Sequence, residues 1–227
     1  MNIIGSTKDY LKRYKIIYDL YFMLVTPIRT KAIKKNGFYV LNLVNEVFQS
    51  LNLKHFADFG TLLGFIREKN FISHDADLDF GVLINEEGER KLIEYEMKKR
   101  GFIKTQEFIY EGEVVEESYK IQGVKVDFFY YKNEENKSKC YSFYRLPEVH
   151  YKKITDFSVF EYNFSKINEL ENIILNGTRV PVPKNPEKAL EEKYGINWKV
   201  PDEKFEFWMS PSIVNVDAIG ILKKKNF

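Results

Sequence analysis

Apolar residues recur at helical spacing through the first fifty positions of the chain. A capping box at Ser6-Thr7-Lys8-Asp9 predicts where the first helix begins, and Pro27 predicts its end. A second helix is expected over residues 40–51. The apolar positions are Leu11, Tyr14, Tyr18, Phe22 and Val25 in the first helix, and Val40, Leu43, Val44, Val47, Phe48 and Leu51 in the second.

The middle of the chain mixes helical segments with segments that alternate as strands do. Gly101 is placed at the C′ position of a helix over 85–100 and is expected to end it. Gly123 is placed to form the turn between strands 114–122 and 124–131. The expected strands are residues 54–59, 77–84, 102–110, 114–122 and 124–131, and the expected helices are 61–68 and 85–100.

The last third predicts further strands at 140–145 and 154–162, and a hairpin in 173–180 around Asn176-Gly177. A helix over 186–194 follows Asn185 and ends at Gly195, so that a helical tail is expected.

Helices, a mixed centre with hairpins and a helical tail indicate an α+β fold: a mixed sheet with flanking helices and an N-terminal helical segment. The chain has no repeat and no linker rich in Gly or Ser, which favours one domain over residues 1–227. Within it we expect N-terminal helices in 1–52, a core that carries the chemistry in 53–135, and a hairpin and helical part in 136–227.

Composition narrows the class of protein. The 227 residues include one cysteine, Cys140, which excludes a disulfide framework and a cysteine-based metal site. No apolar run reaches the roughly 18 residues of a membrane span, and the N-terminus lacks a signal-peptide pattern. We therefore expect a cytoplasmic protein.

Basic charge is concentrated at the N-terminus. Residues 1–36 hold eight Lys and Arg against Asp9 and Asp19, a net +6 in a chain whose total is +2. Such an arm favours an anionic surface nearby, and contact with the inner face of the cytoplasmic membrane is one candidate. The apolar stripe of the first helix is more simply explained as part of the core. A nucleic-acid partner is not expected, because no known binding motif is present.

Three aspartates carry the candidate chemistry. Asp77 and Asp79 are two apart in an otherwise apolar strand, so they project to the same face, and Asp127 interrupts a second apolar strand. If these strands are neighbours, the three acids converge. Such a group suits Mg²⁺ or Mn²⁺ and in-line displacement at phosphorus.

Four further residues complete the outline as candidates for cofactor and donor binding. Gly60-Thr61 precedes a short helix, where the backbone near the helix N-terminus can approach a phosphate, although Thr61 could serve only as a helix N-cap. Arg67 on that helix could clamp a phosphate, and a structural ion pair is an equally good interpretation. Asp75 is either an added ligand or a loop residue. His74 could line the same pocket, although a polar surface residue is the simpler interpretation.

The arrangement resembles the nucleotidyltransferase-like fold and, within it, the LicD/fukutin family of phosphotransferases. The resemblance rests on GTLLGFIR (60–67), FISHDADLDFGV (71–82), VKVDFFYY (124–131) and VPVPKNPEKALEEKYGINWKVP (180–201). The chain departs from the family at Ser73-His74, where a Pro-aromatic pair is frequent.

The resemblance implies transfer of a phosphorylated small alcohol, such as phosphocholine or glycerol- or ribitol-phosphate, from a CDP-activated donor. The acceptor would be a sugar hydroxyl of a cell-surface glycan, which a lipid could carry at the inner leaflet, and CMP would leave. By the same resemblance Asp77 and Asp79 are the metal pair and Asp127 is the third acid.

Three rival functions stay open. The sequence DADLD contains the Asp-x-Asp pattern of nucleotide-sugar glycosyltransferases. A nucleotidyltransferase that uses an NTP would share the three acids. A degenerate scaffold protein is the rival that is not an enzyme, although the presence of all three acids disfavours it.

Overall fold

The structure is a computed structural model that describes residues 3–225, with side chains described for residues 23–86 and 88–225. Its helices are α1 (Ile3–Leu51), α2 (Phe59–Arg67), α3 (Glu87–Lys99) and α4 (Pro186–Tyr194), with a 3-10 turn at Phe207–Met209. Its strands are β1 (Lys54–Ala57), β2 (Leu78–Leu83), β3 (Ile103–Tyr110), β4 (Glu113–Ile121), β5 (Val124–Asn133), β6 (Lys137–Tyr144), β7 (Asp156–Ser165), β8 (Leu170–Leu175), β9 (Thr178–Pro183) and β10 (Ile213–Lys224). The expected α+β class is confirmed.

One large mixed sheet organises the fold, with strand order β1-β2-β5-β4-β3-β10-β7-β6. Strands β5 and β6 also pair with each other at the end of β5, so the six strands from β5 to β6 close on themselves. All pairs in the sheet are antiparallel except β2 with β5, which run parallel. Strands β8 and β9 form a separate hairpin.

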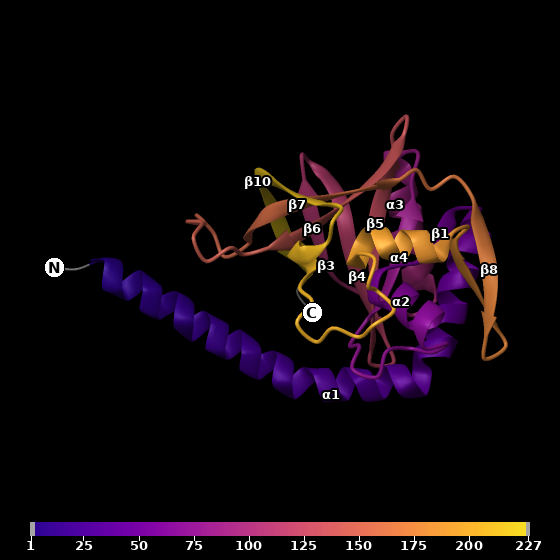
Figure 1. Ribbon diagram of the computed structural model, residues 1–227, viewed down its shortest axis with the longest axis horizontal. Coiled ribbons are helices and arrows are strands. Elements are labelled where there is room, and N and C mark those ends of the chain that lie inside the picture. Colours follow the sequence, from indigo (N-terminus) through magenta and orange to yellow (C-terminus); the bar gives the residue numbers. More distant parts are fainter. Residues whose placement is uncertain (1–2, 226–227) are drawn as a thin grey trace.

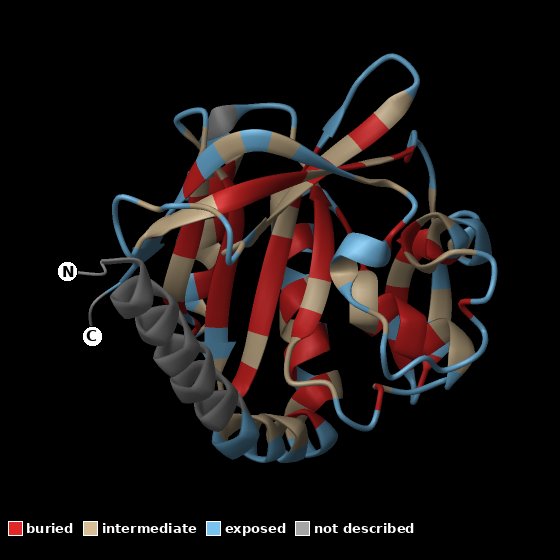
Figure 2. Ribbon diagram, turned by 60° about the vertical axis from the view of Figure 1, so that its left-hand side comes forward, coloured by how far each residue is buried: buried red, intermediate tan, exposed pale blue. Residues whose placement is uncertain are grey.

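A helical layer covers one face of the sheet. The C-terminal half of α1 contacts α3 and β5, and α2 contacts β2 and α4 (Figure 1). The side chains between these helices and the strands form the main core, and Figure 2 shows the buried positions running along the facing strands and helices. The helix-facing residues include Val44 and Phe48 of α1, which are fully buried. Burial of this apolar face holds the sheet and the helices in register.

The N-terminal segment differs from the two helices that the sequence predicts. Residues 3–51 form one helix, and Pro27 lies inside it. Proline removes one backbone hydrogen bond and disfavours the preceding turn, but the helix on either side can continue when other contacts hold it. Those contacts begin soon after Pro27, at Thr30 and the buried Ile33. No helix within residues 3–225 is both long and apolar enough to cross a membrane.

The C-terminal segment also differs from prediction. The helix expected over 186–194 is present as α4, but beyond it β10 inserts between β3 and β7 of the sheet instead of continuing a helical tail. Its pairing with β7 is interrupted by a register shift between Asn215 and Ile219, and Asp217 has a positive φ of 23° there. This irregularity breaks the alternation that would have marked the strand in the sequence.

The hairpin predicted at Asn176-Gly177 is confirmed, because these residues form the turn between β8 and β9. Their φ values are 48° and 74°. Two successive left-handed residues make the type of turn that Asn-Gly favours between antiparallel strands.

Candidate functional site

Asp77, Asp79 and Asp127, here named the aspartate cluster, come together where β2 runs beside β5. Asp79 lies directly opposite Asp127 in the parallel pairing, and Asp77 immediately precedes β2. Each residue offers one carboxylate oxygen, and these oxygens lie within 4.8 Å of one another. The convergence depends on a long connection, because α3, β3 and β4 all lie between the two strands in sequence.

The alternation of the two strands explains why the carboxylates share a face. Leu78 and Phe80 of β2, and Val126 and Phe128 of β5, point into the core beneath the helices and are almost fully buried. Successive residues of a strand point to opposite faces, so the residues between them must face away from that core. Burial of these apolar residues therefore places Asp79 and Asp127 together on the opposite face of the sheet.

The electrostatics of the cluster are unfavourable without a cation. Burial, and then the charge of Asp77, raise the pKa of Asp79 well above its usual range. Burial also raises the pKa of Asp127, although Lys125 opposes the shift. Nearby Asp75 has its pKa raised to about 7 by burial and by Asp77. Crowded carboxylates of this kind, of which Asp127 is buried and the others are half-buried, favour their charged forms only when positive charge is supplied.

One carboxylate oxygen of Asp127 indicates whether the cluster suits a metal ion. Its Oδ1 atom is buried and has no hydrogen-bond partner among the side chains that the structure describes. A buried carboxylate oxygen without a partner is costly, and a hard divalent cation takes just such oxygens as ligands. The residues present therefore fit Mg²⁺ or Mn²⁺.

Lys125 is a site residue that the sequence analysis missed. Its ammonium bonds to Asp127 Oδ2 at 2.5 Å and lies 3.4 Å from Asp77 Oδ2. Burial alone would lower the pKa of Lys125, but Asp127 and Asp77 raise it. The signal was available, because Lys125 and Asp127 are two apart on one strand and so share a face.

Glu116 of β4 was missed for a different reason. It is buried, and burial together with the charge of Asp127 raises its pKa to about 8. In the sequence it is one of two adjacent glutamates, and only the pairing of β4 with β5 shows which of them faces Asp127. A single strand's pattern does not reveal which strand will lie next to it.

The N-terminal turn of α2 holds the backbone of Asp79 in place. The hydroxyl oxygen of Thr61 accepts a hydrogen bond from the Asp79 backbone N–H at 2.8 Å. The backbone N–H of Asp58 donates to the carbonyl of Asp79 at 3.0 Å. Thr61 is buried. In this structure Thr61 therefore fixes the backbone of Asp79.

Gly60 allows a close approach between the first turn of α2 and the loop before β2. A β-carbon at Gly60 would lie 3.0 Å from Asp75 Oδ2. The absence of a side chain therefore leaves room for the Asp75 carboxylate beside the helix N-terminus. The structure thus brings Gly60 and Asp75 together, next to the aspartate cluster.

Arg67 is turned toward other protein groups. Its guanidinium bonds to Glu68 Oε1 at 2.8 Å and to the carbonyl of Trp198 at 3.4 Å. Its Nε is buried and has no partner in the described part of the chain. This geometry ties α2 to the segment after α4, so in the structure Arg67 makes contacts within the protein. His74, in the loop before β2, is exposed.

A buried ion pair behind the site was also missed. Lys193 of α4 lies 3.0 Å from Asp58 Oδ1, and the Tyr131 hydroxyl donates to Asp58 Oδ2 at 2.6 Å. Lys193 also lies 3.5 Å from the centre of the Phe164 ring. Asp58 is the N-cap of α2, so this pair links α4 to the turn that holds Asp79. The position of Asp58 before a predicted helix was its only signal in the sequence.

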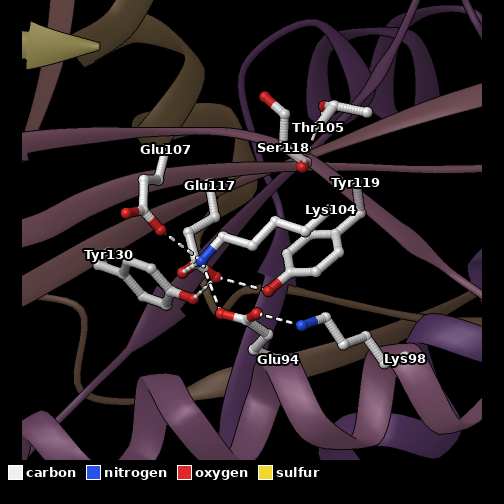
Figure 3. A network of polar contacts seen from close by, with 9 residues as sticks. All are labelled: Glu94, Lys98, Lys104, Thr105, Glu107, Glu117, Ser118, Tyr119 and Tyr130. Carbon is white, nitrogen blue, oxygen red and sulfur yellow. Dashed lines mark hydrogen bonds and ion pairs between the residues drawn. The ribbon is translucent and has the colours of Figure 1, made fainter. Parts of the chain in front are cut away.

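Glu94, Glu107 and Glu117, here named the glutamate cluster, form a second group of three carboxylates on the helix-facing side of the sheet. Lys104 occupies its centre and pairs with all three (Figure 3). The hydroxyls of Tyr119 and Tyr130 both donate to Glu117 Oε2. A lysine already supplies the positive charge, so this cluster is a structural network.

A family model described as "LicD/FKTN/FKRP, nucleotidyltransferase domain" matches residues 52–185. That range is more than half of the chain and contains every member of the aspartate cluster. The chain belongs to the LicD/FKTN/FKRP family. It is accordingly a transferase of the LicD kind. The matched range ends at the start of α4, so most of the 180–201 signature lies outside it.

No curated protein matches the chain. Among solved structures, a crystal structure of ANT(2″)-Ia in complex with adenylyl-2″-tobramycin is similar with a TM-score of 0.43 and 10% identity. The similarity covers 78% of this chain and 85% of that one.

Proposed function

We propose that this LicD-family protein transfers a phosphorylated small alcohol from a CDP-linked donor to a sugar hydroxyl of a cell-surface glycan, with Mg²⁺ or Mn²⁺ as cofactor. The observation that carries the proposal is the aspartate cluster, with three carboxylate oxygens within 4.8 Å and a buried Asp127 oxygen that has no donor in the part of the chain that the structure describes. Family membership and the motifs of the sequence supply the choice of donor.

Asp77, Asp79 and Asp127 are the residues that would hold the metal. When bound, a divalent cation neutralises charge on the donor's phosphates and on the oxygens that attack and leave. Lys125 keeps Asp127 and Asp77 in place through its two contacts, and Thr61 fixes the backbone of Asp79. These contacts preorganise the carboxylates before the substrates arrive.

The reaction forms one bond and breaks one. The acceptor's hydroxyl oxygen attacks the phosphorus that carries the small alcohol, and the bond from that phosphorus to the bridging oxygen breaks. CMP leaves with the bridging oxygen and its electron pair. The hydroxyl proton passes to a carboxylate of the cluster, which is within reach of any group bound there.

The first experiment measures stabilisation by ligands. The purified chain is melted with EDTA or Mg²⁺, alone and with CDP-choline, CDP-glycerol, CDP-ribitol, a UDP-sugar or ATP. A ligand at 100 times its dissociation constant adds about 2.7 kcal/mol, which raises the melting temperature of a domain this size by roughly 5–10 °C. We expect a shift from one CDP compound that requires the metal.

Variants and products then separate the rivals. Asp77→Asn should abolish the shift, whereas Asp217→Asn, at an exposed aspartate of β10, should retain it. Release of CMP in the presence of a glycan acceptor supports the proposal. Pyrophosphate release from ATP, or a response to the UDP-sugar alone, would instead support a nucleotidyltransferase or a glycosyltransferase. No response to any compound, with metal and acceptor present, would support the scaffold.

A further inference from the structure

The outer side of α1 exposes large apolar residues around Pro27. The exposed fractions are 63% for Met23, 68% for Leu24 and 70% for Ile28. Leu24 and Ile28 are one helical turn apart, so their side chains lie on the same side of the helix. A stripe of exposed apolar side chains on a helix is a candidate interaction surface.

Lysines continue that side of the helix. Lys31, Lys34 and Lys35 are exposed, and Lys31 and Lys35 follow Leu24 at helical spacing. The sequence before Met23 adds four basic residues and two acidic ones, which keeps the segment strongly positive. The outer side of α1 therefore combines apolar side chains with a cluster of positive charge.

The flank of the same helix holds the loop that leads into the aspartate cluster. The Thr30 hydroxyl donates to the carbonyl of Asp75 at 3.0 Å. Asn36 donates to the carbonyl of Gln122, in the turn that precedes β5, at 3.0 Å. Two of the segments that carry the site are thus fastened to α1 within eight residues of its exposed stripe.

We propose that residues 23–39 of α1 dock on an anionic lipid surface, with Leu24 and Ile28 inserted and Lys31, Lys34 and Lys35 beside the headgroups. Helices of this kind lie in the interface, with the apolar side buried about 5–10 Å. A helix is about 10–12 Å across, so docking holds the Asp75 loop about one helix diameter from the headgroups. The consequence, access to a lipid-linked acceptor, rests on the proposed function, but the docking itself does not.

The combination of side chains favours lipid over the other partners of a basic helix. Nucleic acid would use the lysines but would leave the neighbouring Leu24 and Ile28 in water. A second copy of the chain would bury the apolar residues but would bring two lysine clusters together. An anionic bilayer accommodates both kinds of side chain at once.

The test is flotation of the whole protein with vesicles of phosphatidylcholine, either pure or with a quarter phosphatidylglycerol, in the absence of donor and metal. We expect binding to the anionic vesicles that falls as salt is raised. Each lysine contributes about fivefold, so Lys31→Gln/Lys34→Gln/Lys35→Gln should weaken binding on the order of a hundredfold. Leu24→Gln/Ile28→Gln should weaken binding to the same vesicles.

Two controls match these variants. Lys184→Gln/Lys188→Gln/Lys199→Gln removes the same charge from lysines near α4 that are 60–64% exposed, and binding should change less than about threefold. Asp77→Asn should bind vesicles as the unaltered protein does, so a failure of the proposed chemistry leaves this result intact. Circular dichroism confirms that each variant is folded.

Several results would overturn the docking proposal. Equal loss of binding in the two lysine triples would show attraction by total charge alone. A stable dimer in light scattering that Leu24→Gln/Ile28→Gln dissociates, without vesicle binding, would assign the surface to a second copy. Binding to duplex DNA but not to vesicles would assign it to nucleic acid.

Discussion

Two groups of three carboxylates lie on opposite faces of the same sheet, and they differ in how their charge is met. In the glutamate cluster Lys104 pairs with all three acids, and two tyrosines complete the bonding of Glu117. In the aspartate cluster Lys125 contacts only Asp127 and Asp77, and Asp127 Oδ1 has no donor among the described side chains. The charges of the glutamate cluster are therefore paired within the protein, whereas the aspartate cluster has an oxygen left to bind a cation.

The pKa shifts express the same difference. In the glutamate cluster, burial raises the pKa of Glu94, but hydrogen bonds from Lys104 and Lys98 outweigh burial and lower it to about 2. In the aspartate cluster burial dominates, and the pKa of Asp79 is raised. Three carboxylates thus stabilise the fold where a lysine pairs with all of them, and remain unfavourably crowded where it does not. Unfavourable charge of that kind is typical of functional sites, and it favours the aspartate cluster as the candidate site.

The largest expected effect is a loss of activity when an acid of the aspartate cluster, but not of the glutamate cluster, is replaced. Asp79→Asn should lower kcat/KM for the transfer at least about a hundredfold, because several kcal/mol of charge stabilisation depend on the metal that Asp79 would hold. The melting temperature in EDTA should stay the same or rise, since one negative charge leaves a crowded group. CMP release and thermal melting measure the two quantities.

Glu107→Gln is the matched control for that variant. It removes one carboxylate from the glutamate cluster, where Glu107 bonds to Lys104 at 2.6 Å. It should lower the melting temperature and keep kcat/KM within about threefold. Full activity in Asp79→Asn would contradict the assignment of the aspartate cluster as the metal site.

The next largest effect is a loss of stability when the central lysine of the glutamate cluster is replaced. Lys104→Met leaves three glutamates without their shared cation, and breaking a buried ion pair costs about 3–5 kcal/mol. The melting temperature should fall on the order of 10 °C. Lys98→Met removes a 57% exposed partner of Glu94 and should cost less than about 1 kcal/mol. A melting temperature of Lys104→Met within 2 °C of the unaltered protein would show that the network is not structural.

The smallest effect is a pH dependence that belongs to Glu94. Its pKa is about 2 in the folded protein against 4.5 for an ordinary glutamate. A carboxyl with a lowered folded pKa stabilises the fold above the unfolded value and loses that contribution as pH falls through the folded value. The melting temperature should therefore fall between about pH 4.5 and pH 2. Glu94→Gln should melt lower at pH 7 and decline less over that window, and an unchanged decline would refute the assignment.

Part of the site could be predicted from local pattern. Asp77 and Asp79 were found because a strand's alternation places residues two apart on one face, and apolar neighbours indicated that the face is partly buried. Lys125 could have been found by the same rule from Asp127. Thr61 and Gly60 were singled out as phosphate-binding candidates, yet in the structure Thr61 fixes the Asp79 backbone and Gly60 makes room for Asp75.

Other parts required contacts between segments far apart in the chain. The sequence does not distinguish Glu94, Glu107 and Glu117 from ordinary surface glutamates, because Lys104 reaches them only after α3, β3 and β4 have packed. The continuous helix through Pro27 and the irregular strand β10 were missed for the same reason. Neighbouring elements stabilise both, against local signals that favour a break.

The sequence by itself determined the α+β class, the LicD-type motifs, the strand faces that carry Asp79 and Asp127, and the positive charge of the N-terminal segment. These are local properties, set by the spacing of side chains along a helix or strand. Only the tertiary structure decided that β2 and β5 run side by side, that Lys104 fills one acidic cluster, and that Lys125 leaves the other incomplete. Charge balance in a buried site depends on which side chains meet in space, and that is fixed by packing between segments that are far apart in the chain.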